Sequence, residues 1–166
     1  GPFCIIYGFG FSGYYAACHA FGKMNIFFRF LIYACLGSGV ELICGILLKY
    51  CLNMKAWTYS RYPLNFMGII CLKMTIIWGI VGLVFQLLMP IFDRLLSHME
   101  GRAWNIGCII FSVFMAINFI VTGACLLRWK ERHEKKPPSN GIEEIIDKHY
   151  DSDFMEERFI EWRFLN

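Results

Sequence analysis

The sequence predicts an all-α integral membrane protein: a polytopic transmembrane helix bundle of about four spans, followed by a charged, partly helical tail. Of its 166 residues, 57% are hydrophobic and only 17% are charged, whereas soluble domains carry about 25% charged residues. The charges are also unevenly placed. Residues 1–127 contain eight Lys/Arg and three acids, and residues 128–166 contain eight Lys/Arg and ten acids. This distribution is typical of a membrane domain with a polar tail and gives no sign of nucleic-acid binding.

Four apolar windows are long enough to cross a bilayer, which takes about 20 mainly apolar residues for about 30 Å of hydrocarbon. We expect the third window to end at Pro90 and the fourth to end at the charged run that begins at Arg128. A stack of buried soluble helices is the alternative, but four such windows within 127 residues argue against it. The predicted spans are residues 3–22, 26–48, 68–89 and 104–127.

The tail changes character twice. Residues 128–140 form a basic linker with two prolines, which cannot continue a helix. Residues 141–166 are acidic, and their apolar side chains recur at helical spacing. Two interpretations stay open: the segment docks on a partner or on the protein's own loops, or it is a solvated and partly helical tail.

The placement of Lys and Arg near the span ends predicts the orientation of the chain in the membrane. The loop at 49–67 and the start of the tail together carry eight basic residues, against four on the opposite side. We therefore expect this loop and the C-terminal tail to be cytoplasmic. Trp57, Tyr59 and Tyr62 in the loop are predicted to be interfacial anchors.

Small residues allow helices to approach closely in lipid, and three predicted spans carry rows of them. In the second span Gly37, Glu41 and Gly45 share one face, so Glu41 is expected on a protein-facing side. The first span has a stripe at Gly8, Ser12, Ala16 and Ala20, and the fourth has one at Ser112, Ala116 and Ala124 with Asn118 inside the span.

Glu41 and Lys73 are the most informative polar pair, because an ionisable group at membrane depth is costly and rarely lacks a role. Glu41 is predicted about 10 Å before the end of the second span, and Lys73 about 8 Å into the third from the same face. Adjacent antiparallel helices could bring the two together. They either line a polar pathway or form a buried ion pair that fixes helix register, with Lys73 alternatively reaching the surface.

The sequence predicts no metal, no cofactor and no catalytic centre. Eight cysteines contain no C-x-x-C pair and four histidines lack ligand spacing. The letters Gly8-Phe-Gly10-Phe-Ser-Gly13 match a dinucleotide motif, but they lie inside an apolar span without the strand that the motif requires. A P-loop is absent, so the chain itself is not expected to bind ATP in that way. We expect a protein that is not an enzyme.

Several segments resemble one family. They are Gly1-Pro-Phe-Cys-Ile-Ile-Tyr-Gly-Phe-Gly10, the span glutamate Glu41, Trp57-x-Tyr59-Ser60, Pro63-Leu-Asn65, Gly68-x-Ile70-Cys71-Leu72 and Trp78-Gly79. This series, from residue 1 to about 96, resembles the ABC-transporter type IV permeases of bacteria, the CmpB-like membrane proteins. Trp57, Tyr59, Ser60, Asn65 and Gly68 carry the loop signature of the family.

Three positions depart from the family pattern. Thr58 stands where the family has an aspartate, Ile69 where it has an arginine, and Ile5 where a proline is common. The resemblance also implies an earlier membrane helix and a basic loop before Gly1. We therefore expect the chain to be N-terminally truncated, with five spans in the intact protein.

The resemblance implies a permease-like subunit in the bacterial inner membrane, with a separate ATPase subunit. Glu41, Lys73 and Asn118 are then expected to line its polar interior, and the loop at 57–65 to face a cytoplasmic partner. The alternative is a non-transporting interaction or regulatory protein that recruits partners through this loop and the tail. Membrane lipid is an expected partner, a homo-oligomer is left open, and nucleic acid is not expected. The sequence does not indicate a substrate.

Overall fold

A computed structural model describes residues 5–165. The predicted all-α class is confirmed, since long helices make up most of the chain and the strands are two residues each. In order, the elements are α1 (Ile5–Phe21), α2 (Ile26–Cys51), β1 (Met54–Lys55), β2 (Asn65–Phe66), β3 (Ile70–Cys71), α3 (Leu72–Ser97), α4 (Arg102–His133), α5 (Gly141–His149), α6 (Ser152–Arg158) and β4 (Arg163–Phe164).

The chain divides into two compact units. The first, called here the α1–α3 unit, comprises Pro2–Ile46 and Thr58–Gly101. The second, called the tail unit, contains Leu47–Trp57 and Arg102–Asn166. Each unit has a hydrophobic core of its own.

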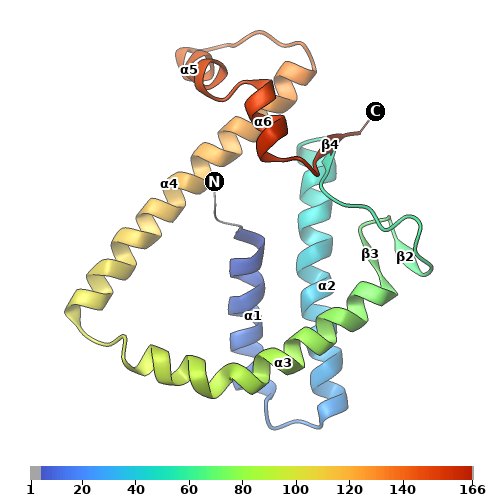
Figure 1. The fold of residues 1–166 in the computed structure, drawn as a ribbon, viewed down its shortest axis with the longest axis vertical. Coiled ribbons are helices and arrows are strands. Elements are labelled where there is room, and N and C mark those ends of the chain that lie inside the picture. The colour runs from blue at the N-terminus through green and yellow to red at the C-terminus, as the bar shows by residue number, and fades with distance from the viewer. Residues whose placement is uncertain (1–4, 166) are drawn as a thin grey trace. The chain divides into compact units, whose positions relative to one another are not determined.

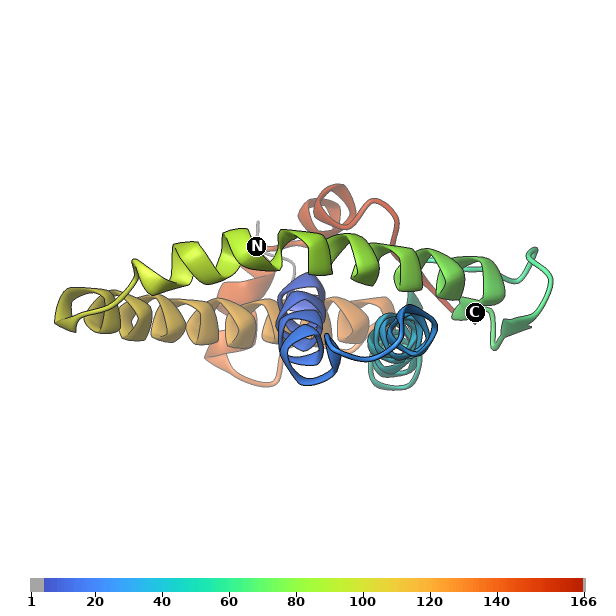
Figure 2. The same cartoon turned by 90° about the horizontal axis from the view of Figure 1, so that it is seen from below.

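In the α1–α3 unit, α1 and α2 lie side by side and α3 runs across them (Figures 1 and 2). The core is centred on Tyr14, Tyr33 and Phe85, one from each helix. Glycines permit the close approach of α3 to α2: a Cβ on Gly79 would lie 2.5 Å from the Phe30 ring, and one on Gly82 would lie 2.5 Å from Tyr33 Cγ. Only glycine fits these crossings without displacing an aromatic side chain.

Two expectations about these helices are wrong. Pro90 does not end the third helix, because α3 continues through it to Ser97. Proline removes one backbone donor, which is tolerated in membrane helices where neighbouring groups satisfy the freed carbonyl. The stripe of small residues on α1 is also not a packing face here: its members are exposed, and the opposite face, with Tyr14, Ala17 and Cys18, is buried instead.

In the tail unit, the tail packs on the C-terminal half of α4 and on the segment after α2. Its core contains Met54, Cys125, Trp129, Ile146 and Met155. β1 and β4 pair antiparallel, with Met54 opposite Phe164 and Lys55 opposite Arg163. Of the two alternatives for the tail, the structure therefore agrees with the first: the tail docks on a loop of the same chain.

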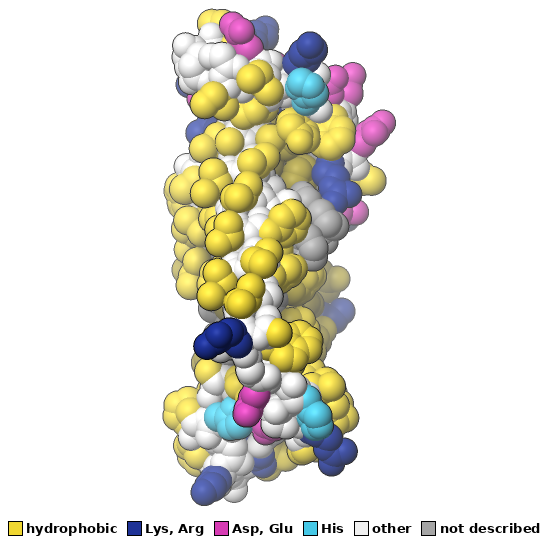
Figure 3. All heavy atoms as spheres, turned by 90° about the vertical axis from the view of Figure 1, so that its left-hand side faces the viewer, with side chains coloured by type: hydrophobic (Ala, Val, Ile, Leu, Met, Phe, Trp, Pro, Cys, Tyr) yellow, Lys and Arg dark blue, Asp and Glu magenta, His cyan; other side chains and the backbone are white. Residues whose placement is uncertain are grey.

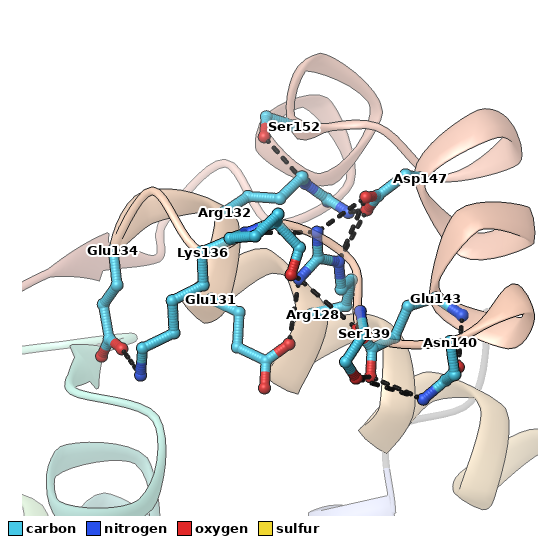
Figure 4. A network of polar contacts seen from close by, with 11 residues as sticks. Arg128, Glu131, Arg132, Glu134, Lys136, Ser139, Asn140, Glu143, Asp147 and Ser152 are labelled. Carbon is cyan, nitrogen blue, oxygen red and sulfur yellow. Dashed lines mark hydrogen bonds and ion pairs between the residues drawn. The ribbon is translucent and has the colours of Figure 1, made fainter.

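A polar network fixes α5 to α4 (Figure 4). Arg128, 2% exposed, donates to both carboxylate oxygens of Asp147 and to Glu131. Its guanidinium also donates to the backbone oxygen of Lys136, within the predicted linker. Asn140 caps α5 by accepting from the Glu143 backbone nitrogen. The network raises the pKa of Arg128, chiefly through Asp147, and lowers the pKa of Asp147, chiefly through Arg128.

Three of the described helices are long and apolar enough to cross a membrane: α2, α3 and α4. α1 has 17 residues and is shorter than a full crossing at 1.5 Å per residue; the predicted first span also includes residues 3 and 4, outside the described part. The apolar window of α4 is almost entirely exposed, although Cys125 and Trp129 nearer its C-terminus are buried, and Figure 3 shows hydrophobic side chains gathered along the helix. Such a surface requires lipid or another apolar partner.

Candidate functional site

The candidate site is the buried carboxylate of Glu41 in α2, which is 8% exposed. It lies ten residues before the helix end at Cys51, about 15 Å along the axis. One carboxylate oxygen accepts a 2.7 Å hydrogen bond from the Tyr59 hydroxyl, and the other accepts a 3.1 Å bond from Trp78 Nε1. Both donors are neutral side chains. A buried carboxylate is therefore held by two hydrogen bonds, and it takes part in no ion pair within residues 5–165.

The helix face that carries Glu41 is the predicted one. A Cβ on Gly37 would lie 2.6 Å from the Cβ of Trp78, and Gly45 packs directly against Ile69. One turn before Glu41, the Ser38 hydroxyl donates a 2.8 Å hydrogen bond to the Thr75 hydroxyl oxygen. The face with Gly37, Glu41 and Gly45 is therefore packed against protein along its length.

The loop before α3 folds into a compact hairpin that delivers Tyr59 to Glu41. β2 and β3 pair antiparallel, with Asn65 opposite Cys71. The Asn65 side chain donates to the Tyr62 carbonyl and accepts from the Gly68 nitrogen. The Tyr59 nitrogen in turn donates to the Gly68 carbonyl at 2.7 Å. Asn65 and Gly68 thus define the loop conformation that places the Tyr59 ring.

Gly68 is required by this loop for two reasons. Its φ of +69° lies in the left-handed region that favours glycine. A Cβ would also lie 2.6 Å from the Ser60 hydroxyl. Ser60 pairs with Thr58, whose hydroxyl lies 2.9 Å away. Thr58 stands at one of the departures from the family pattern, and it retains a polar contact with Ser60 of the loop signature.

The environment of Tyr59 keeps its hydroxyl protonated. Burial, first, and then the hydrogen bond to Glu41 raise the pKa of Tyr59 well above its ordinary value near 10. A phenol in this state remains a donor at physiological pH. The Tyr59–Glu41 contact is thus stable toward ionisation of the phenol, and it connects the surface loop to the interior of the helix pair.

The expected ion pair between Glu41 and Lys73 is absent from the described residues. Lys73 is exposed, and its ammonium lies 5.1 Å from the centroid of the Tyr62 ring, a cation–π contact. The physical reason is the helix start: α3 begins at Leu72, so Lys73 is at its first turn and not 8 Å into a span. Residues 65–71, expected to be helical in part, form the hairpin instead.

The other predicted residues are distributed between the units. Asn118 lies in α4 of the tail unit, half-buried, where it lines a hollow against α6. Trp57 is half-buried in the tail unit as well, while Tyr59, Ser60, Asn65 and Gly68 belong to the α1–α3 unit. Thus the structure joins Glu41 to Tyr59 and Trp78 and not to Lys73, while Asn118 belongs to the other unit.

Sequence reasoning missed the partners of Glu41 and a second polar cluster. In the sequence, Trp78 is identified only as part of the family motif. An indole N–H within a span requires a hydrogen-bond acceptor, and Glu41 was the acidic residue predicted at a similar depth. The second cluster is at Asp93, which lies within α3 and accepts from the Tyr15 hydroxyl at 2.9 Å, with His19 Nε2 3.1 Å from the same oxygen. The continuation of α3 past Pro90 is what places Asp93 opposite α1.

No group of three or more His, Cys, Asp or Glu side chains suited to a metal ion occurs in the described residues. The seven cysteines that the structure describes are free thiols, and Cys4 lies outside the described part. The contacts that the structure gives Glu41 are hydrogen bonds from one phenol and one indole.

Comparison with protein families matches residues 1–123 to the family described as "Putative ABC-transporter type IV", ABC_trans_CmpB. The chain belongs to this family. The match extends past residue 96, where the motif series ended, and takes in α4 as far as residue 123. α5, α6 and β4 lie beyond it. No curated protein and no solved structure matches the chain.

Proposed function

We propose that the chain is a permease-like membrane subunit of a bacterial transport system, in which Glu41 connects a partner-facing loop to the transmembrane helices. Membership of the family supports a transporter component. The observation that carries the finer proposal is the hydrogen bond from Tyr59, in the signature loop, to the buried carboxylate of Glu41. The substrate is not part of the proposal.

The connection has a simple physical basis. Any motion of the loop that withdraws Tyr59 leaves a buried carboxylate short of one donor, which costs about 1–3 kcal/mol or more for a charged group. Trp78 holds the other oxygen from α3, so a change at Glu41 is felt by both α2 and α3. A partner that moves the loop would therefore shift the packing of two helices. Lys73 lies at the first turn of α3, beside Tyr62 of the same loop.

The pairing of β1 with β4 supports the proposed orientation. β1 follows α2 directly and β4 is at the end of the tail, so the chain must return to the same side of the membrane between them. The two helices long enough to cross within that stretch are α3 and α4, an even number of crossings. The greater number of basic residues on this side favours the cytoplasm. Four spans in this chain, in the bacterial inner membrane, remain part of the proposal.

Site-directed photocrosslinking tests the partner. A photoreactive residue at Leu64, which is 75% exposed in the loop, should crosslink to an ATPase subunit recognisable by its P-loop. The matched control is Met99, 45% exposed in the α3–α4 turn on the opposite predicted side. Crosslinking from Leu64 alone supports the proposal. Crosslinking from Met99 alone, or recovery of no ATPase from either position, contradicts it.

A second function, in a non-transporting interaction or regulatory protein, is favoured by the tail unit. The tail has its own core and its own buried arginine network, and it lies beyond the family match. A segment folded in this way offers a defined surface to a cytoplasmic protein. Deleting residues 141–166 distinguishes the two functions, because transport through α1–α3 should survive the deletion and partner recruitment should not.

A further inference from the structure

We propose that the tail unit binds a zwitterionic aminophospholipid in a cleft between α4 and α6. The cleft has a volume of about 250 Å³ and is lined by apolar, aromatic and polar side chains: Asn118, Val121, Thr122, Cys125, Tyr150, Phe154, Met155, Arg158 and Phe159. Pockets that enclose drug-sized ligands usually measure about 300–1,000 Å³. This cleft is therefore suited to one end of an amphiphile, with the rest outside it.

The position of the cleft along α4 corresponds to the edge of a bilayer. Twenty residues counted from Trp104, about 30 Å of helix, end at Gly123. Trp104 is 47% exposed and suits an interfacial anchor at the far end, whereas Trp129 is buried in the tail core. The cleft residues of α4, from Asn118 to Cys125, thus bracket the boundary between hydrocarbon and headgroups.

The apolar surface of α4 leads directly into the cleft. Ile117 and Val121 of α4 are 57% and 43% exposed, and Val121 also lines the cleft. Acyl chains that lie along this surface would place their glycerol and headgroup region between α4 and α6. Tyr150 and Phe154, 5.4 Å apart in an edge-to-face pair, form an aromatic rim of the kind found at headgroup level.

Three polar side chains of the cleft form no ion pair or hydrogen bond with other residues that the structure describes. Arg158 forms no ion pair or hydrogen bond there, and neither do the side chains of Asn118 and Thr122. An arginine with five donors is well suited to a phosphate. Unused donors beside an apolar wall at the membrane boundary match the phosphate and ester groups of a phospholipid.

The surrounding charge selects the headgroup. Arg158 is the only base of α6, and the same seven-residue helix carries Asp153, Glu156 and Glu157, all exposed. A lipid with net negative charge would gain Arg158 and be repelled by the three carboxylates. A headgroup with a phosphate and an ammonium a few ångströms apart satisfies both signs. The cleft therefore favours an aminophospholipid over an anionic one.

Native mass spectrometry of the full chain, purified in detergent and offered phosphatidylethanolamine or phosphatidylglycerol, tests the proposal. Wild-type protein should retain phosphatidylethanolamine at least tenfold better than phosphatidylglycerol, and Arg158→Gln should lose that retention at least tenfold. Lys148→Gln is the matched control, since it removes one exposed positive charge of α5 outside the cleft residues. It should bind as wild type does.

A second variant keeps the test informative if Arg158→Gln folds poorly. Val121→Trp narrows the cleft from α4 without a change in charge and should weaken retention to a similar degree, with unchanged far-ultraviolet circular dichroism. Equal or better binding of phosphatidylglycerol, binding unaffected by both variants, or no retained phospholipid would overturn the proposal. Displacement of the lipid by millimolar inorganic phosphate would also overturn it, because the site would then be one for free phosphate.

Discussion

Replacing Arg128 by methionine should release the tail from α4. The Arg128 side chain is 3% exposed, and it contacts Asp147 through three hydrogen bonds of 2.8–3.1 Å and Glu131 through one of 3.1 Å. Removing one member of a buried ion pair costs about 3–5 kcal/mol. Asp147 is 25% exposed and keeps Arg132 as a partner, which favours the lower end of that range. We expect a loss of about 3 kcal/mol, or roughly a hundredfold rise in the undocked population.

Hydrogen–deuterium exchange followed by mass spectrometry measures this loss directly. Amides of α5 and α6 should exchange roughly a hundredfold faster in Arg128→Met, while those of α2 should keep the wild-type rate. Lys136→Met is the matched control, because its ion pair with Glu134 lies at the surface, where the lysine side chain is 62% exposed and a salt bridge contributes little to stability. If Arg128→Met protects α5 as well as Lys136→Met does, the network does not hold the tail.

Three further predictions follow from the packing and the charges. Gly82→Ala should destabilise the α1–α3 unit by about 1–3 kcal/mol through overlap with Tyr33, partly offset by about 1 kcal/mol of helix propensity; Gly107→Ala, with no atom within 4 Å, should not lower the thermal midpoint. The pKa of Asp147 is lowered in the folded state, chiefly by Arg128, and the pKa of Glu143 is lowered chiefly by the Ser139 backbone. Both carboxylates therefore stabilise docking at pH values above their unfolded pKa values near 4. Exchange protection of α5 should hold from pH 5 to 8 and be lost as the pH falls below about 4; unchanged protection at pH 3 would contradict this. Lys73→Met should leave the stability of the α1–α3 unit within about 1 kcal/mol of wild type, because the ammonium is exposed over Tyr62; a larger loss in detergent unfolding would indicate a buried partner.

The apolar windows predicted the long helices because membrane helices depend on local composition. The packed face with Gly37, Glu41 and Gly45 followed from residue spacing alone. Spacing could not choose between the two faces of α1, since small residues occur on both and only the position of α3 decides which is covered. Proline statistics from soluble helices likewise gave the wrong end for α3 at Pro90.

The Glu41 site was predicted in part. Depth counting identified a buried acid, but it paired Glu41 with Lys73 because residues 68–71 of the hairpin were counted as the start of the third span. A two-residue ladder leaves little periodicity in a sequence, and its glycine at Gly68 is equally compatible with a span. The partners Tyr59 and Trp78 come from a loop and a crossing helix, so their convergence depends on tertiary structure that single-residue patterns do not carry.

The most direct test of the account is a double-mutant cycle on the hydrogen bond between Tyr59 and Glu41, measured by unfolding in detergent. Tyr59→Phe should cost about 1.5–3 kcal/mol in wild type, the range for hydrogen bonds to charged groups. In a Glu41→Leu background the same change should cost less than about 0.5 kcal/mol. Tyr62→Phe is the control, because the Tyr62 hydroxyl forms no hydrogen bond within the described part of the chain and its ring only contacts Tyr59; the change should be nearly neutral in both backgrounds. Equal costs of Tyr59→Phe in the two backgrounds would show that the loop is not joined to the buried carboxylate, and would contradict the proposed coupling.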